Sequence, residues 1–132
     1  MATGLENLKI YTIAEELELR VFELTKHFPR DEKYRSVDQL RRSSSSVTNN
    51  IAESYNKRSL KEKVRILHDI VKSETEETRR NLDVCFKKGF HHDEEIFNRY
   101  TELMKAVSGY IGFLRNRPAT YKLTNLSTYK LT

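Results

Sequence analysis

Cysteine, proline, glycine and tryptophan are scarce in this sequence, which contains one, two, four and none of them, respectively. The lone Cys85 cannot form an internal disulfide, so we expect a protein of the reducing cytoplasm. No stretch approaches the ~20 apolar residues that a membrane-spanning helix needs, and residues 1–9 lack the apolar core of a secretory signal. We therefore expect no membrane partner.

Recognisable catalytic and metal-binding motifs are also missing. The sequence has no Gly-rich phosphate loop, and its serine run, residues 43–46, has no nucleophile elbow. His91 and His92 precede three acidic residues, but adjacent histidines point in different directions. The Glu-x-x-His pairs of di-iron bundles are not found around them. We expect no enzymatic activity, no cofactor and no metal site.

What is abundant is charge on a chain of modest length. The 132 residues suffice for one domain with a modest core, and 33% of them are charged against 37% hydrophobic. This composition favours a helical protein over a β-sandwich or a disordered chain. We expect an N-terminal arm over residues 1–7, a helical bundle over 8–115 and a flexible basic tail over 116–132.

Hydrophobic residues recur at spacings of three and four, as on one face of a helix, in four successive segments. The spacing predicts helices over residues 8–27, 32–55, 60–88 and 94–114. Asp31, Ser59 and Asp93 are the predicted N-caps, and Gly89 the predicted left-handed C-terminal residue. Glu74, Thr78 and Cys85 fall on the inward face of the third helix. Short connections between such helices give an all-α, up-down-up-down four-helix bundle.

The stretch from Gln39 to Tyr55 organises the rest. Leu40, Ser44, Val47 and Ile51 share one narrow face, and the surrounding serines let neighbouring helices come close. A helix of this kind is suited to the middle of a bundle. Its Gln39–Arg42 and Asn50–Glu53 motifs, QLRR and NIAE, together with Phe28-Pro29, Asp31–Tyr34 and Gly89-Phe90, carry a family pattern.

The chain thus resembles, from about Leu8 to Leu114, the four-helix-bundle proteins encoded in 23S rRNA intervening sequences. That family is related to the accessory variability proteins of diversity-generating retroelements. Serines stand here at the family's alanine positions, and Ser54 at its usual glycine. The resemblance implies a ring-like homo-oligomer, commonly a pentamer. Apolar residues outside the four stripes support association; they are Tyr11, Ile13, Phe22, Ile66, Ile70, Phe86, Phe97 and Ile111.

Positive charge is concentrated in the middle and at the end of the chain. Residues 33–65 carry nine basic and three acidic side chains, whereas residues 1–32 carry four and seven. The predicted turn between the second and third helices holds a basic cluster, which consists of Lys57, Arg58, Lys61, Lys63 and Arg65. Such clusters bind phosphate backbones by Coulomb attraction and counterion release. The alternative is a solvated turn that only keeps the protein in solution.

Arg41 and Arg42 also allow two interpretations. They contact phosphate, or they pair with carboxylates of neighbouring helices such as Glu53, Glu74 or Glu77. Asn50 is expected to fix helix register through hydrogen bonds. Tyr55 either stacks on a base or packs against the next helix.

The sequence therefore predicts a non-catalytic accessory protein that binds RNA or DNA through its basic surface. A homo-oligomer would multiply a weak patch, and a reverse transcriptase or a ribosomal component is a possible second partner. The alternative function is a structural or protein-interaction bundle with no nucleic-acid role.

Overall fold

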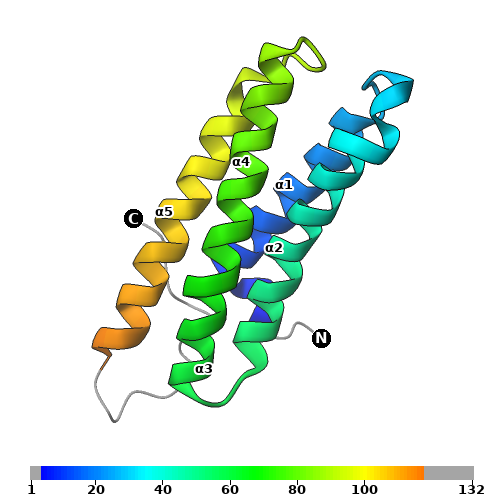
Figure 1. Cartoon of the computed structure of the whole chain (residues 1–132). Helices are drawn as coiled ribbons and strands as arrows, with labels where there is room; N and C mark the ends of the chain where they lie inside the picture. The colour runs from blue at the N-terminus through cyan, green and yellow to red at the C-terminus, as the bar shows by residue number, and fades with distance from the viewer. Residues whose placement is uncertain (1–3, 118–132) are drawn as a thin grey trace.

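Four antiparallel helices make up the computed structural model, which describes residues 4–117 (Figure 1). After the short turn η1 (Gly4–Asn7) come α1 (Lys9–Thr25) and α2 (Asp38–Asn56). The third helix is continuous and consists of α3 (Leu60–Arg65), η4 (Ile66–Val71) and α4 (Lys72–Lys87). The fourth is α5 (Glu94–Asn116). No strand occurs among the described residues, and the predicted up-down-up-down bundle is confirmed.

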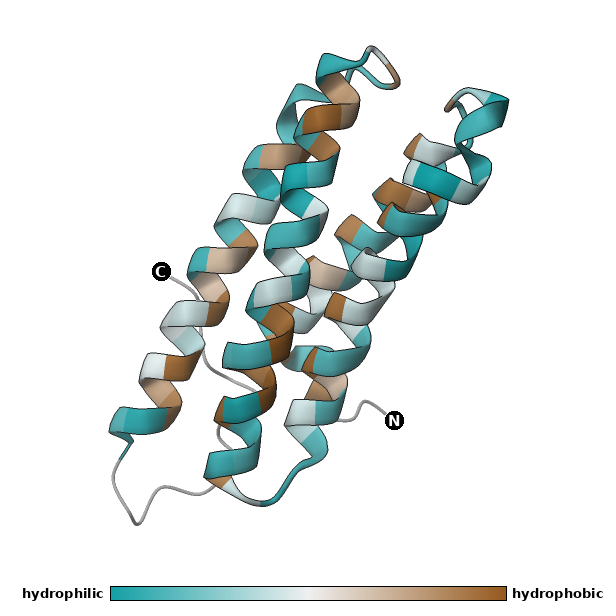
Figure 2. Cartoon of the chain, viewed as in Figure 1, coloured by the Kyte–Doolittle hydropathy of each residue, from teal (hydrophilic) through white to brown (hydrophobic). Residues whose placement is uncertain are grey.

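The core is built from the stripes that the sequence spacing predicts. Figure 2 shows apolar residues recurring between polar ones along each helix. On α5 all six predicted residues are buried, namely Ile96, Tyr100, Leu103, Val107, Tyr110 and Leu114. On α1 the predicted face is buried except for Leu24, which is half-buried. Burial of these side chains is the main stabilising contribution to the fold.

α2 packs closely but does not occupy the middle of the bundle. Leu40, Val47 and Ile51 are 0% exposed, as predicted. α2 contacts α1 on one side and η4 with α4 on the other, and α5 completes the square by contacting α4 and α1. The expectation of a central helix is wrong because each helix of the square packs mainly against its two neighbours. The small residues serve the α2–α4 contact instead, where the hydroxyls of Ser43 and Thr78 hydrogen-bond at 2.7 Å.

The inward face of the third helix differs from the prediction at one position between Val71 and Thr78. Thr75 is fully buried, whereas Glu74, predicted to face inward, is only half-buried. Both positions fit a helix that buries Val71 and Thr78, because the spacing can run three then four or four then three. Thr78 and Cys85 are buried as predicted. Burial raises the pKa of the Cys85 thiol.

The connection between α1 and α2 also differs from the prediction. Asp31 caps no helix, because it lies in the 3₁₀ turn η2 (Arg30–Glu32), which continues directly into the π segment η3 (Lys33–Val37). The chain kinks at Arg35, and α2 begins at Asp38 rather than near residue 32. Val37, the residue before α2, already has helical dihedral angles, so no free helix end remains for Asp31 to cap.

The other predicted helix ends are confirmed. Ser59 Oγ accepts a hydrogen bond from the Glu62 N–H at 3.0 Å, and Asp93 Oδ1 accepts from Glu95 and Ile96 at 3.1 Å each. Gly89 has a φ of +82°, which favours glycine. Its N–H donates to the Phe86 carbonyl, and the next N–H donates to Cys85. This pair of bonds is the Schellman motif.

Much of the apolar material that motivated the oligomer prediction packs within the subunit. Ile66 and Ile111 are buried, and Phe22 is the only member of that set that is exposed, at 44%. The expectation that one bundle cannot bury both sets is wrong for Ile66 and Ile111, whereas the other residues of the set, apart from the exposed Phe22, are half-buried. The predicted tail, with Pro118 and the repeated YKLT, lies outside the described residues apart from its first two positions. Among residues 4–117 no helix is both long and apolar enough to cross a membrane.

Ile51→Ala should lower the free energy of unfolding by about 2–5 kcal/mol, because the fully enclosed side chain leaves a cavity. Urea unfolding monitored by circular dichroism measures this change. Val84→Ala is the matched control: Val84 is 41% exposed, and its truncation should cost no more than about 0.5 kcal/mol. Equal destabilisation of the two variants would contradict the assigned core.

Candidate nucleic-acid interface

The predicted basic cluster lies at one end of the bundle, where α2 turns into α3. Figure 1 shows this turn at the same end as the last turn of α5. α3 and α5 are in contact there. α5 brings Arg115 and Arg117 to this end, and neither arginine was among the site residues predicted from the sequence. The basic excess near the end of the bundle was the signal that could have identified them.

Arg58 and Lys61 are the most available cations of the turn. Both side chains are exposed, and neither forms an ion pair with any side chain in the described part of the chain. Lys57 lies 4.0 Å from Glu53, and Arg65 is held by Glu62 through two contacts of 3.2 Å. Because exposed pairs of this kind are weak, Lys57 and Arg65 can exchange their partners for phosphate, but Arg58 and Lys61 have no such partner to give up.

Lys63 does not belong to the basic surface. It is 3% exposed, and its Nζ donates to the carbonyls of Ser54 at 3.2 Å and Tyr55 at 2.7 Å. These carbonyls close the end of α2, where backbone acceptors lack helical partners. Burial, and then the positive charge of Arg117, lower the pKa of the Lys63 ammonium. The role predicted for Lys63 in phosphate binding is therefore replaced by a structural one.

Tyr55 packs within the same end of the bundle. Its ring is half-buried and lies 5.5 Å from Lys63 Nζ, and its hydroxyl lies against Gly4. A Cβ at Gly4 would collide with that hydroxyl, so any larger residue there would displace the end of the Tyr55 side chain. Of the two interpretations of Tyr55, the structure supports packing.

Arg41 and Arg42 lie near the opposite end of α2 and do not join the turn. The Arg41 guanidinium donates to Thr25 Oγ1 at 2.9 Å and to the Phe22 carbonyl at 3.3 Å, and it stacks 4.4 Å above the Phe22 ring. Arg42 is exposed and lies 3.9 Å from Asp38. The proposed pairs with Glu53, Glu74 or Glu77 are not formed.

Asn50 likewise bonds within its own helix. Its amide donates to the Ser46 carbonyl at 2.8 Å and to the Ser46 hydroxyl. The expected fixing of register between helices is therefore not its role. The Asn50 side chain forms both of these hydrogen bonds with α2 and none with another helix of the described chain.

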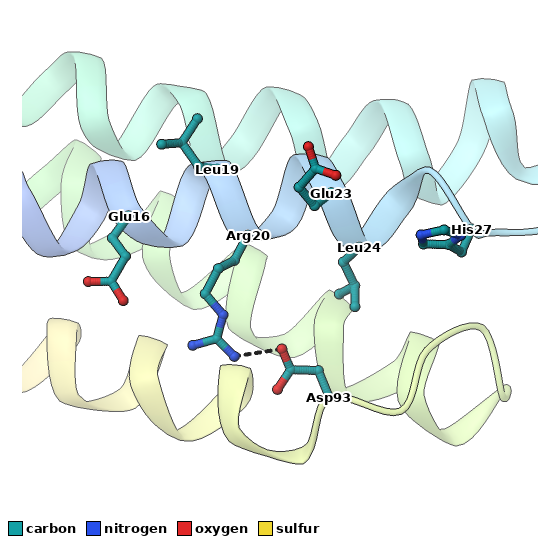
Figure 3. A pocket seen from close by; sticks show the side chains of 7 residues that line it. All are labelled: Glu16, Leu19, Arg20, Glu23, Leu24, His27 and Asp93. Carbon is teal, nitrogen blue, oxygen red and sulfur yellow. Dashed lines mark hydrogen bonds and ion pairs between the residues drawn. The ribbon is translucent and has the colours of Figure 1, made fainter.

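A groove of about 530 Å³ lies between α1 and the start of α5 (Figure 3). Glu16 and Glu23 line it together with Asp93, and Leu19, which is 62% exposed, forms part of its wall. The one arginine in the lining, Arg20, extends from α1 to Asp93. Carboxylates on this rim disfavour phosphate, so a nucleic-acid backbone is not expected here.

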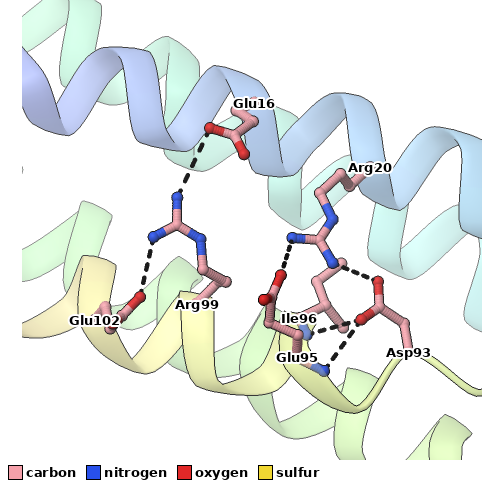
Figure 4. A network of polar contacts seen from close by, with 7 residues as sticks. All are labelled: Glu16, Arg20, Asp93, Glu95, Ile96, Arg99 and Glu102. Atoms are coloured by element: carbon pink, nitrogen blue, oxygen red, sulfur yellow. Dashed lines mark hydrogen bonds and ion pairs between the residues drawn. The ribbon is translucent and has the colours of Figure 1, made fainter.

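Ion pairs tie α1 to α5 beside this groove (Figure 4). Arg20 contacts Asp93 at 2.6 Å and Glu95 at 3.0 Å, while Arg99 lies 3.7 Å from Glu16 and 3.0 Å from Glu102. Burial alone would raise the pKa of the Asp93 carboxyl. The Arg20 contact and the backbone N–H groups at the start of α5 outweigh burial and lower this pKa below its usual value. Arg20 and Arg99 therefore stabilise the contact between α1 and α5.

The buried His91 is held within the fold by hydrogen bonds. His91 is buried; its Nε2 donates to the Leu82 carbonyl at 2.8 Å, and its Nδ1 accepts from the Asp93 N–H. These two bonds require the neutral Nε2–H tautomer. Residues 4–117 contain no group of three or more His, Cys, Asp or Glu side chains placed to hold a metal ion.

Lys63→Met should lower the free energy of unfolding by about 1–3 kcal/mol, because the Ser54 and Tyr55 carbonyls lose their donor. Nucleic-acid affinity of the folded variant should stay unchanged. Lys61→Met, two residues earlier and exposed, is the stability control and should change unfolding by less than about 0.5 kcal/mol. A Lys63→Met variant that is as stable as the wild type but binds nucleic acid more weakly would show that Lys63 belongs to the binding surface.

Asp93→Asn should destabilise the protein by about 1 kcal/mol near neutral pH. The amide oxygen can still cap α5, so the change isolates the missing charge opposite Arg20. Because the folded pKa of Asp93 is lowered, its contribution is present above about pH 4, the ordinary aspartate range, and disappears as the pH falls through the folded pKa. Urea unfolding at several pH values should show the two proteins converging in acid. A difference independent of pH would refute this assignment.

Comparison with known proteins agrees with the geometry of the bundle. The family described as 23S rRNA-intervening sequence protein matches residues 6–111, which span all four helices almost to the end of α5. No curated protein matches the sequence. Because this match covers most of the chain, the protein belongs to the 23S rRNA-intervening sequence protein family.

Proposed function

We propose that the protein is a non-catalytic accessory protein that binds RNA or DNA through the basic end of its bundle. The observation that carries the proposal is the pair of exposed, unpaired cations Arg58 and Lys61 on the α2–α3 turn, close to the arginines that end α5. Phosphate backbones are attracted to such a surface without any specific base contact. The family name, which refers to 23S rRNA, supports RNA as the ligand.

Assembly of several subunits would strengthen this weak surface. One subunit offers few free cations at the turn, whereas a ring-like homo-oligomer, with a pentamer favoured, would present several copies to one nucleic acid. Leu19 and Phe22 are exposed on α1 and provide apolar area for such contacts. A reverse transcriptase, as for the accessory proteins of diversity-generating retroelements, is a further proposed partner. The cytoplasm, where a lone thiol stays reduced, is the proposed location.

A second candidate function is a protein-interaction bundle. The exposed Leu19 and Phe22 beside the carboxylates of the α1–α5 groove favour it, since apolar patches with a polar rim mark protein interfaces. The salt dependence of nucleic-acid binding discriminates between the two functions, because only phosphate contacts release condensed counterions.

The double variant Arg58→Ala/Lys61→Ala should bind all RNAs and DNAs of equal length more weakly. On duplex DNA, the slope of log affinity against log salt should fall by about one unit for each phosphate that the variant no longer contacts. Fluorescence anisotropy over a salt series measures both quantities. Circular dichroism should remain unchanged, because both side chains are exposed and outside the core.

Arg80→Ala/Lys105→Ala is the matched control, since it removes the same charge from exposed positions on α4 and α5. This variant should keep the slope of the wild type. Equal effects of the two double variants would mean that only net charge matters and would reject the turn as the site. No binding by the wild type at low salt would favour the protein-interaction function.

A further inference from the structure

A second concentration of positive charge lies at the other end of α2. A cleft of about 330 Å³ opens where α1 ends and the chain turns towards α2. Four of its eight lining residues are cationic, namely Lys26, Arg30, Lys33 and Arg41, and none is acidic. This is the reverse of the α1–α5 groove, where three carboxylates face one arginine. The cations come from the end of α1, the connecting segment and α2, so only folding brings them together.

Arg41 is fixed in this cleft without being neutralised. Its two hydrogen bonds go to uncharged oxygens, of Thr25 and Phe22, and the Phe22 ring supports its guanidinium plane. Thr25 is itself buried and hydrogen-bonded to the Val21 carbonyl, which makes it a rigid acceptor. Arg20 and Arg99, by contrast, each contact two carboxylates. Arg41 therefore has its position set and its charge available.

The other cations of the cleft are equally open to an anion. Arg30 and Lys33 are exposed and form no ion pair with a side chain of residues 4–117, and Lys26 pairs only with the exposed Glu23 of its own helix. Three carboxylates lie near these cations in sequence. Asp31, next to Arg30, is exposed, does not line the cleft and forms no ion pair with a side chain of residues 4–117. Glu32 is buried and accepts a hydrogen bond from Ser36, and Asp38 lies beside Arg42.

An exposed aromatic ring stands next to the cleft. Tyr34 is 84% exposed, the highest value among the exposed large hydrophobic side chains of the described chain. Lys33, which lines the cleft, has its Nζ 5.3 Å from the centre of the Tyr34 ring. A solvated aromatic ring beside unneutralised cations is the arrangement by which proteins hold single strands, because bases stack on the ring while the backbone follows the charge.

We propose that this cleft binds a backbone phosphate of a single-stranded nucleic acid while a neighbouring base stacks on Tyr34. Arg41 supplies the fixed donor, and Arg30 and Lys33 close on the phosphate from the connecting segment. The inference rests on the proposed nucleic-acid function and adds to it a second contact point and a preference for unpaired strands. The α2–α3 turn has no comparable exposed ring, since Tyr55 is packed against Gly4.

The first test is Arg30→Ala/Lys33→Ala, with binding of a single-stranded 12-nucleotide RNA followed by anisotropy over a salt series. The slope should fall by about 0.7 for each phosphate of the single strand that is no longer neutralised. Arg80→Ala/Lys105→Ala again removes equal charge and should keep the slope. An unchanged slope in Arg30→Ala/Lys33→Ala, with the helical content intact, overturns the proposal.

The second test concerns the ring. Tyr34→Ala should weaken binding of the single strand between about fivefold and 150-fold, the range for removal of one stacked base. Binding of a duplex of the same length should stay constant, because its bases are already paired and stacked. The chain contains no tryptophan, so Tyr34→Trp introduces a single indole whose emission should be quenched by the single strand and not by the duplex. Equal weakening for both nucleic acids overturns the role of Tyr34.

The outcomes separate this inference from the proposed function. If the wild type binds RNA and loses affinity in Arg58→Ala/Lys61→Ala, while the cleft and Tyr34 variants bind normally, the inference fails and the function stands. If the wild type binds no nucleic acid at low salt, both fail. Polyglutamate is the competitor that tests for an acidic-peptide site. If polyglutamate of the same total charge displaces the single strand and quenches the indole of Tyr34→Trp as strongly as the single strand does, the proposal is overturned.

Discussion

The close contact between α2 and the third helix is the constraint on which the rest of the bundle depends. Ser43 and Ser44 are buried, and each hydroxyl is satisfied by a carbonyl three residues earlier in the same helix. A satisfied hydroxyl can lie in the core without penalty, and its small volume lets α4 approach until Thr78 bonds to Ser43. With that face fixed, Arg41 faces α1, where its guanidinium donates hydrogen bonds to the Thr25 hydroxyl and the Phe22 carbonyl.

Cationic side chains that form no ion pair or structural hydrogen bond within the fold remain free to bind a ligand. Arg20 and Arg99 hold α1 to α5, and Arg79 pairs with Glu76 at 2.8 Å while donating to Thr101 of α5. Lys63 closes α2. Among the described residues, cations without carboxylate partners form two groups, at the α2–α3 turn and at the corner between α1 and α2, while others such as Arg80 and Lys105 lie on α4 and α5. The groove between α1 and α5 has the opposite sign and keeps phosphate away.

The sequence predicted features that depend on neighbours along the chain and missed those that depend on neighbours in space. Apolar spacing and the caps at Ser59 and Asp93 are local features, and both are confirmed. Spacings of three and four allow either Glu74 or Thr75 between Val71 and Thr78, and only the packing of the folded helix buries Thr75. Lys63 has the same charge as Lys61, and only the folded α2 end determines that one is buried and the other free. The cationic cleft is missed for the same reason, since its members come from three separate segments.

The two cationic regions lie at a separation that α2 itself sets. Arg41 lies fifteen residues before Asn56, the last residue of α2, which corresponds to about 23 Å along the helix axis at 1.5 Å per residue, and Arg58 follows in the turn. α2 contains neither glycine nor proline and its core face is fully enclosed, so this separation does not adjust to the ligand. One strand of a duplex, with one phosphate per ~3.4 Å of axis, would cover it with about seven phosphates. Shorter strands reach only one region, and neither region reads base edges. If both regions bind nucleic acid as proposed, the protein would distinguish nucleic acids by length and by unpaired bases rather than by sequence.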